Sequence, residues 1–191
     1  DLKIIKPGNY FQETKAGILE LIVKKDLVFM EQPSPIFSEF VSYYELSACF
    51  DNLVFDTQFK PQVVSTGIRE IIVAVKGNEQ LNKLKPNLEK ITLLAKTYQA
   101  IGIHVFTLDD EVDAYTRNFA PVVGIDEESA TGTSNGALAC YLYEYHNKQK
   151  NFVFRQGYSL NLPSEILVEL KLKDKKIQKL YVGGCAKIIE L

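Results

Sequence analysis

Apolar and β-branched residues near the start of the chain predict a β-hairpin over residues 17–30. Its two apolar stretches, 17–24 and 27–30, are separated by Lys25-Asp26, a polar pair that suits a turn. The segment Gln32-Pro33-Ser34-Pro35 follows, and its prolines lack a backbone donor and restrict the residues before them. Regular structure is therefore expected to stop there, which makes this segment a candidate lobe boundary.

The rest of the chain mixes stretches of helical and of strand periodicity. Pro86-Asn87 opens a predicted helix that continues until Gly102, and a second helix is predicted near residues 134–146. The second helix carries one apolar stripe, formed by Ala137, Leu138, Tyr141, Leu142 and Tyr145. The predicted strands are 68–75, 103–108, 114–119, 152–156, 165–172 and 177–182. Many strands with few helices, not alternating one for one, indicate an α+β fold with antiparallel or mixed sheets.

Composition and charge exclude several classes of protein. The 191 residues are 46% hydrophobic and 24% charged, as in an ordinary soluble globular protein. With 22 Lys+Arg and 24 Asp+Glu the net charge is 22 − 24 = −2, so no nucleic-acid partner is expected. No apolar run approaches the roughly 18 residues of a membrane span, and the first residues lack the apolar core of a secretory signal. We therefore expect a cytoplasmic protein without a membrane partner.

Cysteine and histidine offer little chemistry. Cys49, Cys140 and Cys185 are widely spaced and form no CxxC pair, which fits reduced thiols and argues against a metal site. We interpret all three as buried structural thiols. His104 alternates with apolar residues in a predicted strand and His146 lies near a helix end, so both are interpreted as structural or dipole-facing.

The most unusual local chemistry lies in residues 124–136. Three consecutive carboxylates, residues 126–128, precede a small-residue loop that opens the second predicted helix. Such a loop can offer free N–H groups and the positive end of the helix dipole to a carboxylate or phosphate, and a neighbouring acid could then move a proton. The alternative is that Thr133 or Ser134 merely caps the helix and the acids are solvated. Spacing alone leaves both interpretations open.

The same region resembles the PhzF family of phenazine-biosynthesis-like isomerases. Residues 117–121 (R-N-F-A-P), Gly124-Ile125 and 127–133 (E-E-S-A-T-G-T) are similar to the family pattern R-x-F-A-P…G-x-E-D-P-A-T-G-S-A. Further similar stretches follow the family order: 14–19, 33–35, 65–67, 156–157, 163–164 and 182–184. The resemblance therefore covers nearly the whole chain.

The resemblance implies a fold and an activity. The fold would be α+β and diaminopimelate-epimerase-like: two similar lobes, each a sheet wrapped around a central helix, with the active site between them. The activity would be that of an isomerase or epimerase that shifts a proton on a small carboxylated metabolite and needs no metal or organic cofactor. The resemblance makes Glu128 and Thr133 candidate catalytic residues. The resemblance also implies four candidate substrate-binding residues: Ala130, Thr131, Gly132 and Ser134.

The chain departs from the family pattern at several positions. Glu128-Ser129 replaces Asp-Pro, Thr133 replaces Ser, and Leu162 replaces the Arg of a G-R-P-S segment. The family's first-lobe motifs, including an E-T-x-F strand that holds a catalytic Glu, have no counterpart in this sequence. We therefore expect residues 1–37 to be the remnant of an incomplete first lobe and residues 38–191 to form the second lobe.

Two functional hypotheses follow. In the first, the chain belongs to an isomerase and is inactive alone because the principal base is missing. Its partner would then be a second copy in a homodimer or a complementing first-lobe segment. In the second, a degraded PhzF-like lobe serves as a non-catalytic binding or scaffold protein. The retained acid, hydroxyl and glycine favour the enzyme.

Overall fold

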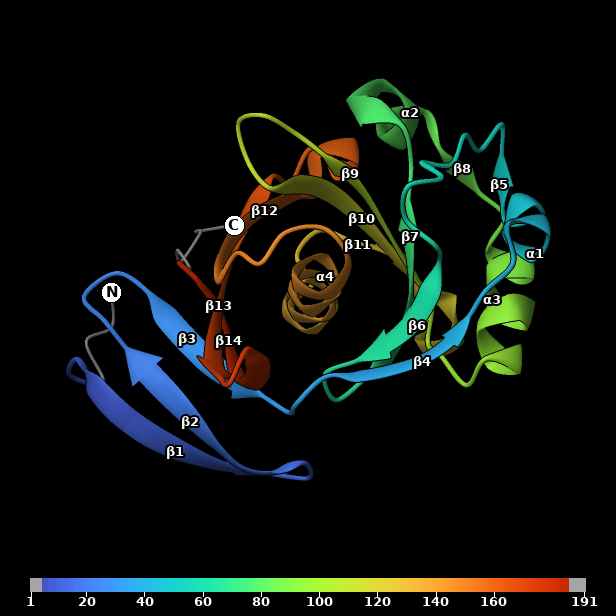
Figure 1. Cartoon of the computed structure of the whole chain (residues 1–191). Helices are drawn as coiled ribbons and strands as arrows, with labels where there is room; N and C mark the ends of the chain where they lie inside the picture. The colour runs from blue at the N-terminus through green and yellow to red at the C-terminus, as the bar shows by residue number, and fades with distance from the viewer. Residues whose placement is uncertain (1–4, 186–191) are drawn as a thin grey trace.

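The computed structural model describes residues 5–185 and shows an α+β fold in which a curved sheet encloses one helix (Figure 1). Among these residues, twelve strands form one mixed sheet, in the order β1-β2-β3-β14-β13-β12-β10-β9-β7-β6-β4 with β11 attached to β10. Their bounds are β1 Gly8–Thr14, β2 Gly17–Val23, β3 Val28–Gln32, β4 Ile36–Phe40, β6 Gln62–Ser65, β7 Arg69–Ala74, β9 Ile103–Leu108, β10 Ala114–Ala120, β11 Ile125–Glu128, β12 Asn151–Gln156, β13 Ser164–Lys173 and β14 Lys176–Gly184. Because β7–β9 and β10–β12 are parallel and the other pairs antiparallel, the predicted α+β class is confirmed.

The helices lie on the two faces of this sheet. Helix α4 (Gly132–Tyr145) occupies the inside of the curve, whereas α1 (Tyr43–Ser47), α2 (Gly77–Lys83) and α3 (Leu88–Thr97) pack on the outside (Figure 1). A short pair, β5 (Phe50–Asp51) with β8 (Lys85–Pro86), lies among the outer helices. The side chain of Asn87 caps α3 as the sequence suggested, but this helix ends at Thr97 and not at Gly102. The chain leaves the helix because Gln99 adopts a positive φ of 53°.

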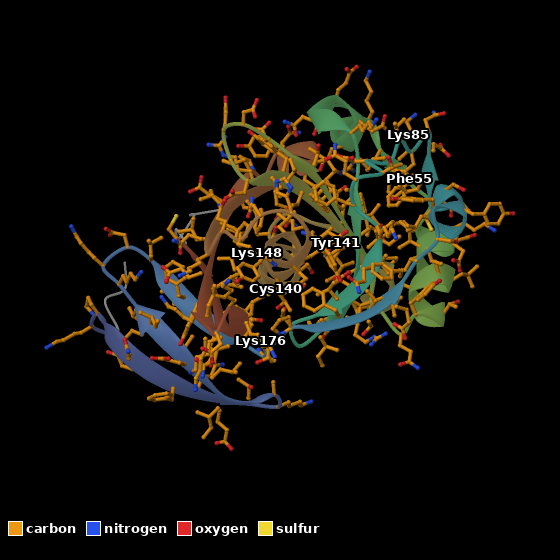
Figure 2. All side chains as sticks on the ribbon, viewed as in Figure 1. Phe55, Lys85, Cys140, Tyr141, Lys148 and Lys176 are labelled. Atoms are coloured by element: carbon orange, nitrogen blue, oxygen red, sulfur yellow. The ribbon has the colours of Figure 1, made fainter. Side chains whose placement is uncertain are left out.

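The predicted single apolar stripe on the second helix is wrong. Every residue of α4 from 134 to 143 is buried, and Tyr145 of the proposed stripe is instead exposed. A helix that is buried all round belongs to the centre of a core. Figure 2 shows Cys140 and Tyr141 on α4 within the enclosed interior, where the Tyr141 hydroxyl donates to the carbonyl oxygen of Lys60 at 2.7 Å.

Strand periodicity divides the apolar side chains into two cores. Ile72, Phe106 and Phe154 point inward and pack around α4, together with Leu180 of β14. Ile71, Val73 and Val105 alternate with them and pack against the outer helices. The central strands β7 and β9 are therefore covered on both faces, which explains why their sequences read as nearly continuous apolar runs.

Regular structure stops at the proline segment, as predicted. β3 ends at Gln32 and β4 begins at Ile36, so residues 33–35 lie between two strands. β3 pairs with β14 and β4 pairs with β6, which places both strands in the same sheet. The division into a first-lobe remnant (1–37) and a second lobe (38–191) stays a prediction, and its boundary falls within β4.

The cysteines are all free, and two of them match the interpretation as buried thiols. Burial raises the pKa of Cys49 to about 11 and that of Cys140 to about 12, which keeps both thiols protonated. The expectation for Cys185 is wrong, because this residue lies just after β14 and is exposed. No helix within residues 5–185 is long and apolar enough to cross a membrane.

Candidate functional site

The carboxylate of Glu128 lies at the end of β11, next to the first turn of α4. The Thr131 hydroxyl donates to Glu128 Oε2 at 2.5 Å. Thr131 is the N-cap residue of α4, with extended backbone angles, but its side chain makes no capping bond to the helix. A Thr at this position normally accepts from the second or third N–H of its helix. Here the hydroxyl holds the acid and leaves the helix N-terminus open.

The first turn of α4 presents three backbone donors. Within the described part of the chain, no group accepts from the N–H of Gly132, Thr133 or Ser134. These are the first three helical positions, whose N–H groups have no acceptor inside the helix and carry the positive end of its dipole. We call these three N–H groups the cradle. Such a group of donors suits an anionic oxygen, and Glu128 lies directly beside it.

Gln156 at the end of β12 fixes the loop between β11 and α4. Its Nε2 donates to the Glu128 carbonyl oxygen at 2.7 Å and to the Thr131 hydroxyl oxygen at 2.9 Å. Its Oε1 accepts from Asn135 Nδ2 at 2.8 Å and from the Thr131 N–H at 3.3 Å. One buried amide therefore sets the position of both the acid and the helix start, and the sequence analysis assigned it no role.

Gly157 allows this loop to lie close to the following turn. Its φ is 83°, and a Cβ there would come within 2.1 Å of the Leu162 carbonyl oxygen and 2.7 Å of the Ser129 carbonyl oxygen. Any other residue would push the loop away, because Cβ atoms do not approach backbone oxygens that closely. The Ser164 hydroxyl adds a hydrogen bond to the Ser129 carbonyl oxygen at 2.7 Å.

Arg117 and Glu127 form a buried ion pair behind β11. Arg117 Nε and Nη2 donate to the two carboxylate oxygens of Glu127, each at 2.8 Å, and both side chains are nearly inaccessible. Arg117 Nη1 also donates to the carbonyl oxygens of Leu81 and Leu84 at the end of α2. Glu127 therefore stabilises β11 through this ion pair, whereas the carboxylate of the neighbouring Glu128 lies at the cradle.

Thr133 links α4 to the end of β3 and to the residue that follows β6. Its hydroxyl donates to Gln32 Oε1 at 3.2 Å, and its carbonyl oxygen accepts from the Thr66 hydroxyl at 3.0 Å. Gly132 and Gly136 let the helix approach β14, where a Cβ on Gly136 would lie 2.9 Å from Val182 Cγ2. The small residues of the motif thus serve packing as well as the cradle.

The Ser134 hydroxyl points into the interior and donates to Glu70 Oε1 at 3.0 Å. Glu70 comes from β7 and is fully buried. It belongs to a polar layer that surrounds the first turns of α4, formed by inward-facing side chains of neighbouring strands: Glu70, His104, Thr116, Asn118 and Gln156. Further along α4 the inward positions are apolar.

His104 is part of this layer and is uncharged. Its Nδ1 lies 3.0 Å from Asn118 Oδ1, and burial lowers the pKa of the ring to about 4, although the hydrogen bond with Asn118 and the polar side chain of Asn135 oppose that shift. The structural interpretation of His104 is therefore confirmed. His146 is exposed at the end of α4, about one helix length from the cradle.

All the predicted site residues come together at one end of α4. Glu128 ends β11, Ala130 and Thr131 lie on the following loop, and Gly132, Thr133 and Ser134 form the first turn of α4. Their roles stay a prediction.

Glu70 was not predicted as a site residue. The sequence feature that could have indicated it is a single acid inside the apolar run of residues 68–75. A separate cavity of about 430 Å³, lined in part by Asp109, Asp113 and His146, lies at the opposite end of α4.

Sequence comparisons match the chain to proteins that are named uncharacterized isomerases. The family model for phenazine biosynthesis-like proteins, PhzC-PhzF, matches residues 2–190. An uncharacterized isomerase of Clostridium acetobutylicum is 31% identical over 139 residues, covering 69% of this chain and 46% of that protein. The uncharacterized isomerase YfhB of Bacillus subtilis is 30% identical over 176 residues, covering 85% of this chain and 59% of that protein. The chain spans about half the length of these curated relatives.

Solved structures that match this chain include a member of the same family. A PhzF-family phenazine biosynthesis protein of Bacillus anthracis matches with a TM-score of 0.82 and 25% identity, over 95% of this chain and 66% of that protein. A probable proline racemase of Agrobacterium radiobacter matches with a TM-score of 0.62 at 14% identity, over 96% of this chain and 59% of that protein, which shows a shared fold. With the family model matching almost from end to end, this chain belongs to the PhzC-PhzF family of phenazine biosynthesis-like proteins.

Proposed function

We propose that this chain supplies one half of the active site of an isomerase or epimerase that shifts a proton on a small carboxylated metabolite. The observation that carries the proposal is the placement of the Glu128 carboxylate beside the open first turn of α4. Family membership and relatives named as isomerases support it. The proposed reaction uses acid and base groups and needs no metal or organic cofactor.

The two parts of the site have different tasks in this scheme. The cradle, preceded by Ala130, binds the substrate carboxylate through N–H groups and the helix dipole. The Thr133 hydroxyl, which donates to Gln32 in the free chain, turns its proton to the bound substrate at the same end of α4. Glu128 then gives or takes the proton on the bound molecule. The bonds from Thr131 and Gln156 hold this part of the site in place before a ligand arrives.

A proton shift needs a second group on the other side of the substrate. Among the described residues, Glu128 is the one carboxylate that lies at the cradle with partial exposure, because Glu70 is buried and Glu127 is paired with Arg117. We propose that the second group, the principal base, comes from a first-lobe glutamate. A complementing first-lobe segment or a second copy of the chain in a homodimer would supply it.

The test is exchange of substrate hydrogen with solvent deuterium. A panel of small carboxylates is incubated in D2O with the 191-residue chain alone, and with the chain plus a first-lobe segment taken from a relative. We expect no exchange with the chain alone, because one carboxylate in an open site cannot complete the transfer and water competes for the substrate. We expect exchange when the segment is added.

Two outcomes would contradict the proposal. Exchange catalysed by the chain alone would show that it holds both groups and would overturn the shared site. No exchange in either sample, with the added segment shown to bind, would favour a non-catalytic binding or scaffold role.

A further inference from the structure

A carboxyl group is buried directly behind the first turn of α4. Glu70, on the inward face of β7, has only 1% of its surface exposed. Its Oε1 accepts from the Ser134 hydroxyl at 3.0 Å, and Ser134 also supplies the third N–H of the cradle. The cradle and a buried acid are therefore joined through one residue.

The groups around Glu70 offer it no positive charge. His104 of β9, paired with Asn118 of β10 in the same polar layer, is neutral, and the charge that acts on Glu70 is the negative one of Glu128 at the end of β11. On the strand itself, the Arg69 side chain points away and donates to Ser38, Glu39 and the Tyr98 carbonyl oxygen. Arg117 is bound to Glu127. A negative charge on Glu70 would therefore be buried without a counter-ion.

Three buried polar atoms near this point have no hydrogen-bond partner in the described part of the chain: Glu70 Oε2, His104 Nε2 and Asn118 Nδ2. Buried polar atoms are normally paired, and an unpaired cluster marks a place where the protonation state of its members matters. Burial raises the pKa of Glu70 to about 8, and the charge of Glu128 raises it further. The hydrogen bond from the Ser134 hydroxyl and the polar side chain of Asn118 oppose the shift.

We propose, resting on the function proposed above, that Glu70 is a positioning residue whose proton keeps the cradle able to bind an anion. In its neutral form Glu70 accepts from Ser134 and holds the first turn of α4 against the sheet. Loss of the proton places a buried negative charge behind the cradle, next to Glu128. That charge repels an anionic ligand. It also attracts water, or a hydrogen-bond donor that changes its position, to the first turn of α4.

A purely structural role predicts something different. If Glu70 only filled space, its ionisation would change stability but would leave the local environment of the cradle and its affinity for anions the same on both sides of the titration. The distinguishing readout is therefore a pH profile measured at the cradle itself.

The experiment follows threonine methyl groups by NMR, because Thr131 and Thr133 flank the cradle and methyl signals do not exchange with water. The 191-residue chain with ¹³C-methyl threonine is titrated from pH 6 to pH 10 as wild type, Glu70→Gln and Glu13→Gln. Glu13 is an exposed acid on β1 and serves as the control. Sodium acetate, the anionic probe, is then titrated at pH 6.5 and at pH 9.5 at constant ionic strength.

The proposal expects one step centred near pH 8 in the Thr133 methyl signal of wild type and Glu13→Gln, and no such step in Glu70→Gln. It also expects acetate affinity to fall about tenfold or more between the two pH values in wild type and to change little in Glu70→Gln. Absence of the step in wild type, or its persistence in Glu70→Gln, would overturn the proposal.

Two further results distinguish the proposed role of Glu70 from the proposed function of the cradle. Acetate binding that is equal at both pH values would contradict the role of Glu70 while supporting the cradle. A clear methyl step with no acetate binding to residues 131–134 at either pH would contradict the proposed function instead. If Glu70→Gln does not fold, Ser134→Ala is measured instead. Removing the hydroxyl that connects Glu70 to the cradle should reduce the pH-dependent step in the Thr133 methyl signal. A step of undiminished size would refute the connection between Glu70 and the cradle.

Discussion

Replacing Arg117 by methionine tests whether the ion pair behind β11 supports the site. The substitution keeps most of the side-chain volume but removes both hydrogen bonds to Glu127 and both bonds to the carbonyl oxygens at the end of α2. The side chains of the pair are only 8% and 12% exposed, so Glu127 would be left as a nearly buried charge without a counter-ion, with the Ser159 hydroxyl as its remaining donor.

Removing one member of a buried ion pair typically costs about 3–5 kcal/mol, because the remaining charge stays desolvated. For a chain of this size each kcal/mol corresponds to about 2–4 °C in melting temperature, so we expect a decrease of about 6–20 °C. Glu127→Gln in the same background should restore part of the loss, because a neutral amide is less costly to leave unpaired.

The measurement is thermal and urea unfolding of wild type, Arg117→Met, the double variant and Lys83→Met. Lys83 forms an exposed pair with Glu79 along α2, and its loss should change stability little because solvent screens the pair. If Arg117→Met is no less stable than Lys83→Met, the reasoning is wrong and β11 does not depend on this pair.

Three other substitutions test the packing and the polar layer around α4. Gln156→Ala should lower the free energy of unfolding, measured by urea denaturation, by about 2–3 kcal/mol, because it leaves buried donors and acceptors of the loop unpaired. Unchanged stability would show that water replaces the amide. Gly136→Ala should cost about 1–3 kcal/mol, since its Cβ would lie 2.9 Å from Val182 Cγ2, and a neutral result would mean that α4 can move away from β14. Below its ordinary pKa of 6.5, His104 binds a proton in the unfolded state but stays neutral in the fold down to about pH 4. Stability measured in urea should therefore fall as the pH is lowered from 6.5 to 4, by up to about 1.4 kcal/mol per pH unit, and His104→Gln should lose that part of the slope.

Much of the fold was predictable because its local signals are strong. Five strands of the second half, β9, β10, β12, β13 and β14, were located within one or two residues, since alternating or continuous apolar runs there are bounded by Pro, Gly and Lys-rich turns. The short strand β11 was not predicted, because its sequence is mostly acidic. The helix over 134–146 was also predicted, and it starts two residues earlier at Gly132. Its burial on all sides over residues 134–143 did not follow from periodicity, because a stripe of apolar residues cannot reveal that a sheet closes around the remaining face, although the family resemblance implied a central helix.

The site was predictable only where its residues are close in sequence. Glu128 and Thr131 are three positions apart, and the small-residue loop between them and the helix is visible in the sequence. Gln156 and Glu70 reach the same place from β12 and β7, through strand pairings that span tens of residues. Single-sequence patterns do not specify such long-range register, so the amide that fixes the loop and the acid behind it emerged only from the structure.

The central claim is that Glu128 moves a proton on a carboxylate held by the cradle. The most direct test is the rate of solvent-deuterium exchange in the chain complemented with a first-lobe segment, compared between wild type, Glu128→Gln and Asp126→Asn. Asp126 is an exposed acid two residues away on the same strand and controls for the loss of one charge. We expect Glu128→Gln to lower the rate by about 10²-fold or more with the fold intact by circular dichroism, and Asp126→Asn to leave it within about twofold. Exchange by Glu128→Gln at the wild-type rate would contradict the claim and leave these acids with no role beyond the start of a helix.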